Sequence, residues 1–146
     1  MLGFDPDRLC ETIEDRFAIP VITTALATLE HLRVRTFKRL ALLTQGDAPE
    51  AGRIAKAFAK EGIQTASSRS LGIAANFDAA LTPTSRLAEE TRALALASSP
   101  DAILIWSTNL DGHALLGKTG EPNLEILDSA TLGFEMALQR LRLQHI

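Results

Sequence analysis

Short apolar runs alternate along this chain with longer segments whose apolar residues recur every three or four positions. Four runs are compact enough for buried strands, and they lie at residues 40–44, 63–68, 102–106 and 124–127. The periodic segments between and after them predict helices at 49–60, 85–97 and 130–143. Strands and helices that alternate at this spacing form right-handed βαβ units. The pattern therefore predicts a three-layer α/β domain with about four parallel strands.

Two further helices are predicted before the first strand. The acidic residues around Pro6 are typical of a first helical turn, and an apolar stripe then recurs every four positions at Leu9, Ile13 and Phe17. Thr23 and Thr24 are candidate caps for a second helix at 25–32, after a short extended run at 19–22. Residues 71–82 are rich in small side chains and predict a loop.

Composition limits the class of protein. The 146 residues suit one domain, and 46% hydrophobic with 23% charged residues is the balance of a soluble globular protein. A net charge of −3 gives no footprint for nucleic acid, and no apolar run reaches membrane-spanning length. One cysteine excludes an internal disulfide and a cysteine-based metal cluster, and no Gly-x-Gly-x-x-Gly string indicates a dinucleotide. We expect a cytoplasmic protein without metal or cofactor.

The strand at 102–106 runs directly into a cluster of small polar residues. The string Trp106-Ser107-Thr108-Asn109-Leu110 resembles the second catalytic loop of the aspartate/glutamate/hydantoin racemase superfamily, especially its maleate isomerase and arylmalonate decarboxylase branch. Members usually carry a reactive cysteine in a Ser-Cys-Thr-Asn-Leu-like string, and Ser107 occupies the cysteine position here. The string at 69–73, Arg-Ser-Leu-Gly-Ile, resembles arylmalonate decarboxylases as well. The resemblance implies a flavodoxin-like lobe of the racemase architecture.

The resemblance also implies a chemistry, namely proton transfer, addition or decarboxylation at a carbon next to a carboxylate. Two acid/base groups, one in each lobe, would face that carbon. A cysteine pKa of about 8.5 is readily lowered to give a thiolate, whereas a serine hydroxyl needs an adjacent base. Ser107, the candidate catalytic residue, is therefore a poor proton carrier. It remains a hydrogen-bond partner for a carboxylate beside the backbone N–H groups of Thr108 and Asn109, or else Ser107 and Thr108 only cap the following helix.

Two other positions carry over from the resemblance. Thr44 ends the strand at 40–44, where relatives hold a polar pocket residue, but Gln45 and Gly46 stand where the family often has a substrate-binding tyrosine. Asn76 lies in a loop similar to one that helps bind carboxylate in maleate isomerase relatives. Its alternative role is that of a left-handed turn residue. Because parallel strands end at one edge of a sheet, we expect a small carboxylate near Thr44, Asn76 and 107–109.

The remaining candidates favour structural interpretations. Cys10 lies on the first predicted helix, so a small, partly buried residue is a better interpretation than a nucleophile. His113 lies close enough in sequence to approach Ser107, but an exposed histidine in a first helical turn is commoner. Four basic residues precede the first strand, and we interpret them as a solvated edge rather than an anion site: Arg33, Arg35, Lys38 and Arg39.

The resemblance covers only the later part of the family's sequence. The first lobe's opening strands and its catalytic loop have no counterpart, so either the chain is a remnant or the true start lies upstream. A weak internal echo between 23–30 and 128–135 agrees with the family's two similar lobes. The sequence thus indicates one racemase-like domain, 1–146, acting as an isomerase, racemase or decarboxylase-like enzyme, or a silent remnant that binds a carboxylate or a protein. Uncovered apolar faces at 1–32 and 130–146 would favour a homo-oligomer.

Overall fold

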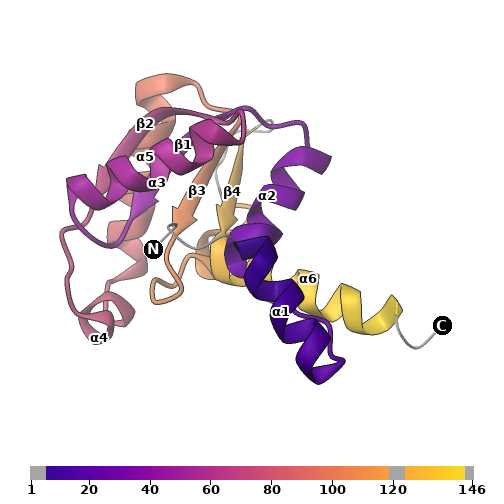
Figure 1. The fold of residues 1–146 in the computed structure, drawn as a ribbon. Helices are drawn as coiled ribbons and strands as arrows, with labels where there is room; N and C mark the ends of the chain where they lie inside the picture. The colour runs from indigo at the N-terminus through magenta and orange to yellow at the C-terminus, as the bar shows by residue number, and fades with distance from the viewer. Residues whose placement is uncertain (1–5, 119–123, 144–146) are drawn as a thin grey trace.

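The computed structural model describes residues 6–118 and 124–143, which form a four-stranded parallel sheet with helices on both faces (Figure 1). The strand order is β2-β1-β3-β4, so the two most apolar strands occupy the centre. The strands are β1 (Arg39–Thr44), β2 (Gln64–Ser70), β3 (Ala102–Trp106) and β4 (Glu125–Asp128). The three-layer α/β fold predicted from the hydrophobic pattern is therefore confirmed.

Alternate side chains of the central strands enter two separate cores. Leu42 and Leu104 point to the face covered by α2 (Thr24–Val34), α3 (Ala48–Lys60) and α6 (Ser129–Leu143). Leu43 and Ile105 point to the opposite face, beneath α5 (Thr84–Ser98). All four side chains are fully buried. A continuous apolar strand is what burial on both faces of a parallel sheet requires.

Two segments differ from the sequence-based prediction. The expected loop at 71–82 contains a short helix, α4 (Asn76–Ala80), whose Ala79 is buried against the second core. Five residues are too few for apolar periodicity to emerge, so the pattern could not indicate this helix. After Ser107, the short helix that follows is a single 3₁₀ turn, η1 (His113–Leu115).

Two of the helices, α2 and α6, pack closely against each other. Thr23 caps α2 by accepting a hydrogen bond from the backbone N–H of Leu26 at 3.2 Å, as the sequence predicts. Gly133 of α6 lies against Thr24, since a Cβ at position 133 would come within 2.9 Å of the threonine methyl carbon. The two segments that resemble each other in sequence, 23–30 and 128–135, contain the first turns of these two helices. The N-termini of both helices lie at the same end of the sheet.

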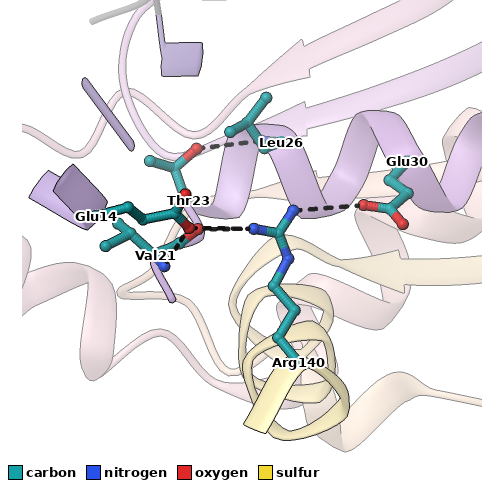
Figure 2. Close-up of polar contacts among 6 residues, drawn as sticks. All are labelled: Glu14, Val21, Thr23, Leu26, Glu30 and Arg140. Atoms are coloured by element: carbon teal, nitrogen blue, oxygen red, sulfur yellow. Dashed lines mark hydrogen bonds and ion pairs between the residues drawn. The ribbon is translucent and has the colours of Figure 1, made fainter. Parts of the chain in front are cut away.

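The first helix, α1 (Pro6–Phe17), and the second half of α6 project away from the sheet (Figure 1). Arg140 of α6 joins this helical arm to α2. Its guanidinium donates to the carbonyl oxygen of Val21 at 2.9 Å and lies 3.7 Å from a carboxylate oxygen of Glu14 and 3.9 Å from one of Glu30 (Figure 2). Glu14 also accepts from the Val21 backbone N–H at 2.7 Å, so one charged cluster fixes the α1–α2 connection.

Burial lowers the pKa of the half-buried His31, which lies on α2. The nearby Arg35 lowers this pKa further, and Glu135 on α6 opposes the shift. The neutral imidazole is therefore favoured at neutral pH, and His31 contributes little charge between the two helices. Within residues 6–118 and 124–143, no helix combines the length and apolar character needed to cross a membrane.

Candidate active site

A cavity of about 630 Å³ lies at the carboxyl ends of the strands, the edge at which open parallel sheets place their ligands. Its wall includes Trp106, whose ring packs nearly perpendicular to that of Phe58 with centroids 5.3 Å apart. The cavity is lined by strand-end loops and helix starts, comprising Thr24, Gln45, Gly46, Asp47, Glu50, Arg53, Gly72, Ile73, Ala74, Asn76, Trp106, Ser107, Thr108, Asn109 and Ser129. We call this space the strand-end pocket.

Gln45 lies at the centre of the polar contacts in the strand-end pocket. The register pairs Thr44 of β1 with Trp106 of β3, which places the next residues, Gln45 and Ser107, side by side. The Gln45 Oε1 atom accepts two hydrogen bonds, from the Ser107 hydroxyl at 2.9 Å and from the Asn109 side-chain amide at 3.0 Å. The Nε2 atom of Gln45 donates to Asn76 Oδ1 at 3.1 Å. One glutamine therefore connects three separate segments of the chain.

The loop after β2 is held in place by the backbone of the loop after β1. The N–H of Gly72 donates to the Gly46 carbonyl at 2.8 Å, and the N–H of Ile73 donates to the Gln45 carbonyl at 2.9 Å. Gly72 has φ +68°, a left-handed conformation that side chains disfavour. This turn carries the chain across the pocket wall to Asn76 at the start of α4.

Three long helices begin at the strand-end pocket, with Thr24, Asp47 and Ser129 lining it at or beside the first residues of α2, α3 and α6. A helix N-terminus carries roughly half a positive charge and favours anions. Two of the three are already capped by carboxylates. Asp47 accepts from the N–H of Glu50 at 2.8 Å, and Asp128 accepts from the N–H of Thr131 at 2.8 Å. The remaining positive potential is therefore modest.

The charged side chains lining the pocket have both signs. Within the part of the chain that the structure describes, the lining contains the carboxylates of Asp47 and Glu50 and the guanidinium of Arg53. Glu50 is half-buried and lies over Gly46, because a Cβ at position 46 would overlap its carboxylate. The described residues contain no group of three or more His, Cys, Asp and Glu side chains that could hold a metal ion.

The structure brings together four of the five site residues expected from sequence. Ser107, Thr108, Asn109 and Asn76 line the strand-end pocket. Thr44 is fully buried instead, and its hydroxyl lies 3.2 Å from Ser70 Oγ and bonds the Arg69 carbonyl at 3.5 Å. Its contact with a ligand stays a prediction, because Thr44 is outside the lining.

Both alternative structural interpretations of these residues are wrong. Ser107 does not cap a helix, because its Oγ accepts from the Asn109 N–H at 3.0 Å, whereas η1 begins only at His113 after Gly112. For the same reason Thr108 and Asn109 are not at a helix start. Asn76 is not a left-handed turn residue either, since it is the first residue of α4 and has no positive φ.

The weaker candidates, Cys10, His113 and the basic run at 33–39, make contacts that are typical of structural residues. Cys10 is buried in α1. His113 is exposed and its Nδ1 lies 3.2 Å from the Thr131 hydroxyl. The basic run lies at the amino ends of the strands, at the end of the sheet away from the strand-end pocket. There Arg33 pairs with Glu61 at 2.8 Å and Arg35 pairs with Glu125. These pairings agree with a solvated edge.

Sequence reasoning missed Gln45, Glu50, Arg53 and Ser129 as pocket residues. Gln45 had a usable signal, because it directly follows the carboxyl end of a buried strand, as Ser107 does. Glu50 and Arg53 are on the first turns of α3, and their direction depends on how that helix packs on the sheet. The sequence alone carries no information on that packing.

Comparison with known proteins agrees with this architecture. The family model described as arylmalonate decarboxylase matches residues 3–145. The chain belongs to the arylmalonate decarboxylase family. Among curated proteins, none matches the sequence. Membership of the arylmalonate decarboxylase family confirms the resemblance predicted from the residues at 102–112 and 69–73.

Solved structures of two kinds of enzyme are similar to this member of the arylmalonate decarboxylase family. A liganded arylmalonate decarboxylase variant, with one glycine changed to cysteine and one cysteine to serine, is 25% identical with a TM-score of 0.84 over 91% of this chain and 57% of that one. A Nocardia farcinica maleate cis-trans isomerase, a cysteine-to-serine mutant with a covalently bound succinylcysteine intermediate, is 23% identical with a TM-score of 0.85 over 94% and 58%. The chain thus spans under three fifths of the length of these relatives.

Proposed function

We propose that this chain is an isomerase- or decarboxylase-like domain of the racemase superfamily whose strand-end pocket binds a small carboxylate. The observation that carries the proposal is the Gln45 network, which gathers Ser107, Asn109 and Asn76 at one wall of a 630 Å³ cavity. Arg53 and the N-terminus of α2, which is capped by the neutral Thr23, add positive potential for one carboxylate group. Membership of the arylmalonate decarboxylase family and the neighbour described with a covalently bound succinylcysteine intermediate support the same ligand class.

We further propose that the chain alone does not carry out proton transfer between two bases. Ser107 donates its only proton to Gln45 Oε1, an amide oxygen that is too weak a base to remove it. The hydroxyl is therefore held as a neutral group in the position where the resemblance implies a cysteine. This network favours the second candidate function, that of a catalytically silent carboxylate-binding domain.

Exchange of the α-proton with solvent deuterium tests the chemistry directly. We expect no exchange above the uncatalysed rate for aspartate, glutamate or a hydantoin, because the pocket wall offers hydroxyl and amide groups instead of a thiolate. Proton NMR of each compound with the purified chain in deuterium oxide measures the exchange. The Ser107→Ala variant is the matched control. Clear exchange that disappears in this variant would contradict the proposal and make the hydroxyl a proton carrier.

A further inference from the structure

We infer that the strand-end pocket prefers a ligand with one carboxylate and one neutral carboxamide over the matching dicarboxylate. This inference rests on the proposed carboxylate-binding function and specifies its ligand class. Two independent features of the pocket support it, namely its charge and the chemical character of its polar wall.

The charges of the pocket suit one anionic group. Arg53 and the three helix N-termini are positive, but Asp47 and Glu50 line the same cavity, and the α3 and α6 N-termini already bond Asp47 and Asp128. A first carboxylate is compensated by Arg53 and the uncapped positive potential. A second carboxylate meets the charge of Glu50 and Asp47 at close range, where repulsion is only partly screened.

Part of the pocket wall is made of carboxamides. Gln45, Asn76 and Asn109 hold one another through single hydrogen bonds, so each NH₂ group keeps at least one N–H to donate. Ser107 donates to Gln45 and accepts from the Asn109 N–H, so one lone pair of its oxygen remains to accept a further hydrogen bond. A ligand carboxamide can accept from the N–H groups of the wall and donate to Ser107 Oγ, whereas a carboxylate can only accept. The wall therefore matches a neutral amide better than a second anion.

Glu50 can disfavour a second ligand carboxylate because residue 46 is a glycine. A side chain at position 46 would occupy the space that the Glu50 carboxylate fills, so glycine leaves that carboxylate inside the pocket.

Succinate and succinamate test the preference, because they share a carbon skeleton and differ in one terminal group. Isothermal titration of the full chain at pH 7.5 should show that succinamate binds about tenfold more tightly than succinate. The Glu50→Gln variant should reduce this ratio to about threefold or less by improving the affinity for succinate. The Asp47→Asn variant keeps a capping side chain at α3 and should reduce the ratio in the same direction.

The control variant is Glu89→Gln, which removes the same charge from an exposed position on α5, away from the pocket lining. It should leave the ratio unchanged. Equal or tighter binding of succinate would overturn the preference and leave the proposed carboxylate site standing. Absence of binding by both compounds would overturn the preference and the proposed function together.

Discussion

Replacing Leu104 with alanine should lower the free energy of unfolding by about 2–5 kcal/mol. Leu104 is at the centre of β3, is fully buried, and belongs to the core formed with Leu42, Phe58 and Leu132. Its neighbours come from the adjacent strands β1 and β4 and from α2, α3 and α6, so they cannot collapse fully into the space left by three missing carbon atoms. The free-energy cost of the residual cavity adds to the transfer free energy that is lost with the deleted atoms. Urea denaturation followed by circular dichroism measures the change.

The matched control is Leu96→Ala on α5, where the side chain is 79% exposed. This variant should change the free energy of unfolding by no more than about 0.5 kcal/mol. Similar losses in both variants would contradict the assignment of Leu104 to the core, since the same atoms are deleted in each case.

We also expect the chain to associate with itself at micromolar concentration. The helical arm formed by α1 and the second half of α6 exposes large apolar side chains. On the arm, Phe17 is 59% exposed, Leu141 is 46% exposed and Leu138 is also exposed, and Ile19 and Phe134 add exposed apolar side chains beside it. Fully burying each such side chain is worth about 1.5–3 kcal/mol, and several of them on one arm form a surface that favours a second copy. Light scattering after size exclusion should report a dimer or a larger species.

The variant Leu141→Lys tests whether this arm forms the contact. A charge placed in a buried apolar interface should weaken association by roughly tenfold or more. The control is Leu96→Lys, which introduces the same charge at an exposed leucine on the opposite face of the sheet. A wild-type chain that remains monomeric and unfolds cooperatively would contradict the prediction, and equal weakening by both variants would exclude the arm as the interface.

The parts of the fold that were predictable from sequence are those with a strong apolar signal. The apolar runs that became β1 and β3 are buried on both faces, so their continuous character was visible along the chain. β2 was predicted with fewer apolar residues because it lies at the edge of the sheet, and it extends to Ser70 through polar residues paired with β1. α4 escaped prediction because its burial rests on Ala79 alone.

The site residues that could be predicted from sequence are polar residues in the loops that follow the carboxyl ends of predicted strands. Ser107, Asn109 and Asn76 were identified from sequence, and the structure places them in one hydrogen-bond network. The residue that joins them, Gln45, was noticed only as a departure from the family's tyrosine. Its role depends on the pairing of β1 with β3, and strand register is a long-range property that local sequence does not encode.

The position of the carboxylate site is the central claim, and amide NMR shifts test it most directly. The isotopically labelled chain is titrated with maleate, aspartate and phenylmalonate, and the backbone N–H resonances are followed. We expect the largest shifts at Gly46, Gly72, Asn76 and 107–109, where loops and helix starts surround the strand-end pocket. Shifts centred on the basic run at 33–39, at the amino ends of the strands, would contradict the proposed position of the carboxylate site.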